Sequence, residues 1–98
     1  MEKIYLFKLI SGEEMIARVI ADHEHVFVVK QPVTITYHQV DDRITGGFAP
    51  FMPYGGEDNI RIYKTSVAAM SMTPQQRIVD EYIRATTGIQ IAPANSLA

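Results

Sequence analysis

The sequence predicts a mainly β domain: a small, strongly bent, five-stranded antiparallel barrel with an extended hairpin and one C-terminal α-helix. Short segments of strand-like, alternating or β-branched residues follow one another along most of the chain, separated by turn residues. Some of these segments are apolar on both faces, which is typical of the bent strands of a small barrel. A single helical pattern with its own start and stop signals comes after them.

The first three strands form a predicted meander. Residues 3–10 alternate between polar and apolar, and Gly12 lies in the following turn, where it tolerates a positive φ angle. Residues 14–21 are apolar on both faces, so we expect this second strand to be strongly bent or covered on both sides. The polar residues 22–25 predict a turn, and the β-branched run 26–30 predicts the third strand.

The middle of the chain is less regular. Pro32 is expected to bend or end the third strand, although residues 33–37 alternate again. Residues 41–43 are expected to form the tip of a hairpin. The glycines and prolines of residues 46–58 argue against one clean strand there, so we interpret residues 31–58 as a hairpin arm followed by a loop.

Two short strands are predicted to meet at a polar corner near the end of the β region. Ile60 and Ile62 fall on one face of the first short strand. The polar residues 64–66 then interrupt the pattern, and apolar character resumes at Val67.

The helix is predicted over residues 74–87. Thr73 is a suitable N-cap, Pro74 suits the first helical position, Gln76 completes a capping box and Gly88 is the stop signal. The helix is expected to pack on the open end of the barrel or on a neighbouring subunit. It would do so through an apolar stripe made of Ile78, Val79, Tyr82 and Ile83.

Length and composition indicate one small globular domain. We assign the 98-residue chain to a single domain over residues 1–88 and a mobile tail over residues 89–98. The 47% hydrophobic and 20% charged residues argue against a disordered chain, and no apolar run approaches the roughly 20 residues of a bilayer span. The N-terminus shows no export signal and the chain has no cysteine, so we expect a cytoplasmic protein.

The sequence shows no pattern of an enzyme or of a cofactor site. It lacks cysteine, a Gly-x-Ser-x-Gly elbow, a His-Glu-x-x-His motif and a phosphate-binding glycine loop, so we predict no catalytic activity and no cofactor. His23 and His25 lie on one side of an extended strand, where both could contact a metal ion. Because no third ligand is evident, we predict no metal site.

Two segments of the chain resemble the Sm/LSm family, and its bacterial member Hfq in particular. They are KIYLFKLISGEEMIARVIADHEHVFVVK and IRIYKTSVAAMSMTP, which cover roughly residues 3–31 and 59–72. The family's polar corner reads Tyr-Lys-His in Hfq, and here it is Tyr63, Lys64 and Thr65. The resemblance implies an Sm-like (SH3-like) barrel, and bacteriophage genomes also encode proteins of this compact kind, in which case the host cytoplasm is the expected location.

The resemblance further implies a ring that binds single-stranded RNA, or DNA, at loops around its pore. About five to seven copies are expected to join through strand edges. The implied subunit-interface residues are Ile60, Ile62 and Val67. The implied nucleic-acid-binding residues are Tyr63, Lys64, Thr65, Asp22, His25 and Phe27.

Several features depart from the family pattern. The family's N-terminal helix is missing, and residues 31–58 would be an insertion between its third and fourth strands. The base-pocket asparagine of many members is not evident after Asp22, which we expect to fix its own loop by bonding backbone amides. Thr65 also replaces the histidine of the Hfq corner, so the resemblance does not carry uridine specificity to this chain.

A ring or barrel that serves only as a protein-interaction or assembly module is the alternative. The formal net charge of −2 favours it, because no global field attracts the chain to nucleic acid. Its contact would be the loop from Phe48 to Tyr54, whose aromatic residues form either a partner surface or, as we expect, part of the core.

Overall fold

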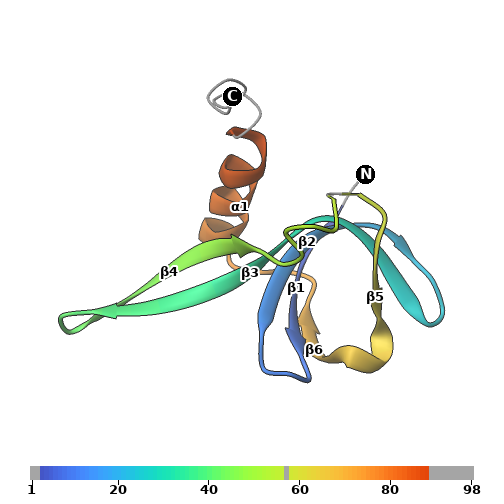
Figure 1. Cartoon of the computed structure of the whole chain (residues 1–98), viewed down its shortest axis with the longest axis horizontal. Coiled ribbons are helices and arrows are strands. Elements are labelled where there is room, and N and C mark those ends of the chain that lie inside the picture. The colour runs from blue at the N-terminus through green and yellow to red at the C-terminus, as the bar shows by residue number, and fades with distance from the viewer. Residues whose placement is uncertain (1–2, 57, 89–98) are drawn as a thin grey trace.

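The computed structural model describes residues 3–56 and 58–88 and consists of a bent β-sheet and a helix that follows it (Figure 1). In chain order the elements are β1 (Lys3–Leu9), β2 (Glu14–Asp22), β3 (Val26–Val40), β4 (Arg43–Pro50), β5 (Ile60–Tyr63), the short 3-10 helix η1 (Lys64–Ser66), β6 (Val67–Ser71) and α1 (Gln76–Gly88). No helix in the described ranges is long and apolar enough to span a bilayer.

The sheet is antiparallel throughout, with the strand order β4-β3-β2-β1-β6. The long strand β3 has two partners beyond β2: its first residues pair with β5, from Val26 opposite Tyr63 to Val29 opposite Ile60, and its later residues pair with β4. The barrel therefore consists of β1, β2, the first part of β3, β5 and β6. The rest of β3 projects from it together with β4 as a hairpin, here called the arm (Figure 1). This is the mainly β, Sm-like barrel that the sequence predicts.

Apolar residues at alternating positions of the strands form the barrel core. The buried cluster consists of Tyr5, Phe7, Leu9, Met15, Ala17, Val19, Phe27, Val29, Ile60 and Ile62. The rings of Phe7 and Phe27 lie 5.3 Å apart at its centre. Side chains between these positions, such as Ile16 and Arg18, point to the opposite face of the sheet, here called the outer face.

A bulge beside Ala17 explains why β3 bends at Pro32 but does not end there, the first of the two predicted outcomes. Arg18 opposes Lys30 and Ile16 opposes Val33, so Gln31 and Pro32 together face a single residue of β2. Gln31 adopts a φ angle of 51°, which bends the strand at this point. Because the ladder is already interrupted at the bulge, the missing N–H of Pro32 leaves no hydrogen bond unmade.

The helix α1 packs on the outer face at this bulge. The side chain of Tyr82 is fully buried, and its hydroxyl donates a 2.6 Å hydrogen bond to the carbonyl oxygen of Gln31. The Arg18 guanidinium donates to Thr86 Oγ1 at 2.9 Å and to Gln31 Oε1 at 2.9 Å, and lies 5.4 Å from the centroid of the Tyr82 ring. On the arm side, the ring of Phe48 meets Tyr82 edge-on at 6.5 Å.

The helix differs from the prediction in its place and its start. It covers the outer face of the sheet rather than the open end of the barrel, and its packing against a neighbouring subunit stays a prediction. It begins at Gln76 rather than Pro74, and the carbonyl of Gln75 accepts its first backbone bonds. Gln76 Nε2 donates to Asp80 Oδ1 at 2.8 Å instead of completing a capping box with Thr73. The tail predicted over residues 89–98 lies outside the described residues.

Candidate nucleic-acid interface

The corner η1 brings most of the predicted binding residues to one end of the barrel. Asp22 ends β2 opposite Phe27, and Tyr63 ends β5 opposite Val26. The backbone N–H of Lys64 donates to the carbonyl of His25 at 2.9 Å, which ties the corner to the turn between β2 and β3. Five predicted residues from two stretches of the chain, residues 22–27 and 63–64, therefore form one cluster.

Lys64 is the centre of this cluster. Its Nζ lies 2.6 Å from Asp22 Oδ1 and 4.6 Å from the centroid of the Phe27 ring. The ring face attracts the cation, and the carboxylate neutralises it. Asp22 thus binds Lys64, in place of the backbone bonds that we expected it to make within its own loop.

Tyr63 offers the accessible aromatic ring of the site. Its side chain is 61% exposed, whereas Phe27 is only 5% exposed and belongs to the core. A base can therefore stack on Tyr63 but not on Phe27. The hydroxyl of Ser66 donates to the carbonyl of Tyr63 at 2.7 Å and holds the corner closed, while Thr65 is exposed at its tip.

The β2–β3 turn contains the two histidines that the sequence offered as metal ligands, His23 and His25. The N–H of His23 closes the turn by donating to Val26, and the exposed ring of His25 lies 3.7 Å from Glu24. Among the residues that the structure describes, no three His, Asp or Glu side chains form a group that could hold a metal ion.

Arg61 belongs to the same surface, although it is not among the predicted binding residues. It is exposed on β5, on the same strand face as Tyr63, while Ile60 and Ile62 point into the core. The alternation of apolar and polar residues along β5 is the sequence pattern that places Arg61 on the exposed face beside Tyr63. Two cations, Lys64 and Arg61, and two acids, Asp22 and Glu24, thus share this end of the barrel, and their formal charges cancel.

Both strands that flank the corner have an open edge in the described part of the chain. β5 pairs only with β3, and β6 pairs only with β1. Of the predicted interface residues, Ile60 and Ile62 are buried within their own barrel and Val67 is half-buried. A neighbouring subunit would therefore meet the backbone of β5 rather than these isoleucine side chains.

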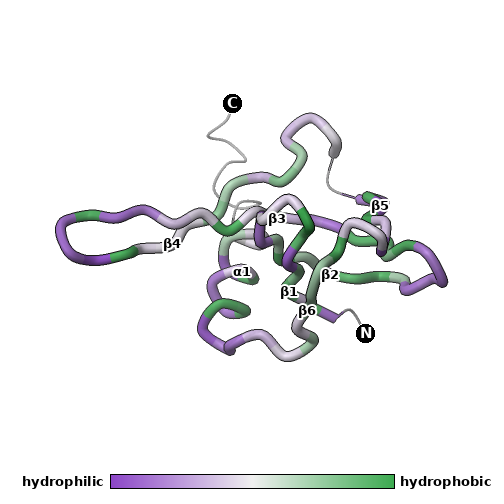
Figure 2. Tube along the Cα trace, turned by 90° about the horizontal axis from the view of Figure 1, so that it is seen from below, coloured by the Kyte–Doolittle hydropathy of each residue, from purple (hydrophilic) through white to green (hydrophobic). Residues whose placement is uncertain are grey.

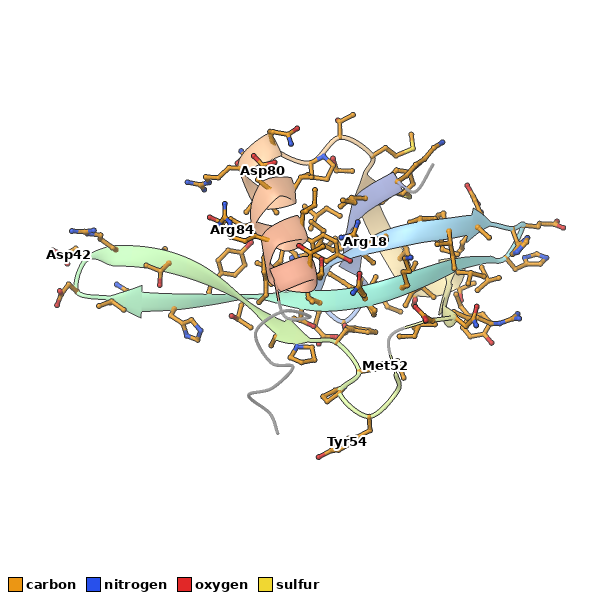
Figure 3. All side chains as sticks on the ribbon, turned by 90° about the horizontal axis from the view of Figure 1, so that it is seen from above. Arg18, Asp42, Met52, Tyr54, Asp80 and Arg84 are labelled. Carbon is orange, nitrogen blue, oxygen red and sulfur yellow. The ribbon has the colours of Figure 1, made fainter. Side chains whose placement is uncertain are left out.

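The aromatic loop after β4 divides between core and surface. Phe51 packs against the core, and its N–H donates to the carbonyl of Pro32 at 3.2 Å. Met52 is exposed and Tyr54 fully so at the end of the loop, as Figure 3 shows. Core packing, which we expected for these residues, thus accounts for one part of the loop only.

The family of the chain follows from its sequence and agrees with this architecture. The family model described as Sm_like domain matches residues 6–83, from β1 through the arm into α1. The chain belongs to the Sm-like family. No curated protein matches the sequence.

Proposed function

We propose that this Sm-like protein forms a cyclic homo-oligomer of about five to seven copies and binds single-stranded RNA, or DNA, around its pore. The observation that carries this proposal is the position of the corner: it lies between the two open strand edges and holds Lys64 and Tyr63 beside His25. Assembly through those edges would repeat the corner around a ring.

The strand edges support the ring. Unpaired backbone groups on β5 and β6 can bond another chain, and β5 carries only one charged residue, Arg61, and no proline to prevent this. Pairing β5 of one copy with β6 of the next is a contact between two different surfaces. Such contacts close into a ring when the rotation between copies divides the circle.

The corner offers the chemistry for a single strand. The Lys64 ammonium can bind a phosphate, and the exposed Tyr63 ring can stack on a base. Arg61 adds a second cation on the face that carries Tyr63. Because five copies carry a formal charge of −10, which is five times −2, binding depends on these local groups rather than on the overall field. We propose no catalytic role and, since the chain lacks cysteine, a cytoplasmic location.

Salt-dependent binding of labelled oligo(U), oligo(A) and single-stranded DNA, followed by fluorescence anisotropy, tests the proposal. Lys64→Ala should weaken all three complexes and reduce the salt slope by roughly 0.7 per lost phosphate contact. Tyr63→Ala should cost about 1–3 kcal/mol per stacked base. Arg43→Ala is the matched control, because it removes a cation from the distant tip of the arm.

A protein-assembly module is the second candidate function. Asp22 already neutralises Lys64, and exposed apolar residues lie elsewhere, including Tyr37 and Ile44 on the arm and Tyr54 on the loop. No binding of any of the three oligonucleotides at low salt would favour this second function over the first.

A further inference from the structure

The arm leaves an apolar face exposed. Directly opposed residues of an antiparallel pair share a face, so the register places Ile35 with Phe48, and Tyr37 with Gly46, on the helix-facing side. Ile44, opposite Gln39, continues that side toward the tip. Tyr37 is 61% exposed and Ile44 71% exposed. Figure 2 shows short hydrophobic stretches on both strands near the hydrophilic tip.

The helix covers only the base of this face. A groove of about 750 Å³ runs between the first turns of α1 and the arm, and Ile35, Tyr37, Ile44 and Phe48 belong to its lining. Figure 3 shows Asp42 at the far end of the arm, well beyond the helix that carries Arg84. A two-stranded hairpin alone is only marginally stable in water, so the outer half of the arm lacks the support that a third strand or a covering layer would give.

The outer edge of β4 is also open. Within residues 3–56 and 58–88, β4 pairs only with β3. Its residues 44–49, ITGGFA, contain no charge and no proline, the two devices with which proteins commonly block an exposed edge. The edge and the apolar face lie on the same strand, so one partner strand could bond the open backbone groups and place its own apolar side chains beside those of this face.

We propose that this partner is β4 of a second copy of the chain, paired antiparallel about a two-fold axis at Gly46. A two-fold axis perpendicular to the sheet keeps the apolar faces of both arms on one side. With Gly46 on the axis, Ile44 of each copy opposes Phe48 of the other, which produces two apolar cross-strand pairs. Tyr37, which opposes Gly46 within each arm, then flanks the axis from both sides.

Charges at the arm ends agree with this register. The tip of the arm, which consists of Asp41, Asp42 and Arg43, reaches the Pro50 end of the other β4 strand. There Pro50 and Ala85 of α1 line a common groove, and the neighbouring Arg84 is exposed. The tip has a formal charge of −1 and residues 44–56 carry none, so no like charges oppose each other along the paired strands.

The contact is independent of the ring and of nucleic acid. It uses β4, whereas the proposed ring uses β5 and β6, and it joins identical surfaces by a two-fold axis. Arm pairing would therefore join one ring to another, and either assembly can fail without the other.

A single cysteine at the axis tests the proposal directly, since the chain has no cysteine of its own. A Cβ at Gly46 would have its nearest contact at 3.6 Å, the carbonyl oxygen of Thr36, so Gly46→Cys fits the arm. Opposed Cα atoms lie about 4.5–5.5 Å apart, within disulfide range. Arg43→Cys is the control, because its two copies would lie roughly 20 Å apart along the strands.

Mild oxidation should convert Gly46→Cys, but not Arg43→Cys, into a covalent dimer on a non-reducing gel. In light scattering, Ile44→Lys should halve the mass of the assembly, while Thr45→Lys, on the other face of the same strand, should leave it unchanged. Equal cross-linking of the two cysteine variants, or equal masses of wild type and Ile44→Lys, would overturn the proposal.

Discussion

The Lys64 ammonium lies 2.6 Å from the Asp22 carboxylate, across the corner that joins β5 to β6. The only basic side chain within the corner itself is therefore already paired. A phosphate that binds Lys64 must displace Asp22 or share the cation with it. The pair thus lowers the affinity of the corner for any polyanion below what a free lysine would give.

Removal of the competing carboxylate should strengthen binding. We expect Asp22→Asn to raise the affinity for single-stranded RNA by about 1.5- to 5-fold, the range that corresponds to an exposed ion pair of 0.2–1 kcal/mol. Glu24→Gln is the matched control, because it removes the same charge from the neighbouring turn without freeing Lys64. Equal effects of the two variants in an anisotropy titration would attribute the gain to net charge alone.

The helix should depend on the Tyr82 hydroxyl for its docking. Tyr82→Phe leaves the carbonyl of Gln31 without this donor and should cost about 0.5–1.5 kcal/mol of unfolding free energy. Tyr82→Ala removes the buried ring as well and should cost about 3–5 kcal/mol. Urea denaturation measures both. Tyr54→Ala, at a fully exposed ring, should change the stability by less than about 0.5 kcal/mol.

The arm should lose stability at alkaline pH. The Tyr37 hydroxyl donates a hydrogen bond to Glu14, and this bond, with smaller contributions from desolvation and the carboxylate charge, raises the pKa of Tyr37 above its ordinary value of 10.0. A raised pKa in the folded state means that the stabilisation is complete below pH 10 and disappears as the pH rises through the folded-state pKa. Ultraviolet titration should show Tyr37 ionising at lower pH in Glu14→Gln, and Tyr37→Phe should lack the transition.

The sequence predicted the barrel because its strands carry local signals. The alternation of residues 60–63 correctly separated buried Ile60 and Ile62 from exposed Arg61 and Tyr63. The hairpin tip at residues 41–43 was also correctly placed. In β5 one strand face meets the core, so the period of the pattern reports the burial directly, whereas the hairpin tip was indicated by its turn residues.

Other features depend on contacts that no local pattern contains. Pro32 predicted either a bend or an end of β3, and the bulge that it forms with Gln31, which adopts a positive φ angle, decides for the bend. The position of α1 depends on Arg18 reaching Thr86, 68 residues away in sequence. The pairing of Asp22 with Lys64, 42 residues apart, likewise appears only when the fold joins β2 to the corner.

The cyclic ring is the central claim, and its mass tests it most directly. Light scattering of the Ile44→Lys variant removes any contribution from arm pairing and isolates the β5–β6 contact. With a chain of 11.0 kDa, a ring of five to seven copies predicts a mass of about 55–77 kDa. A monomer of 11.0 kDa, or a dimer of twice that mass, would contradict the ring and the binding site built around it.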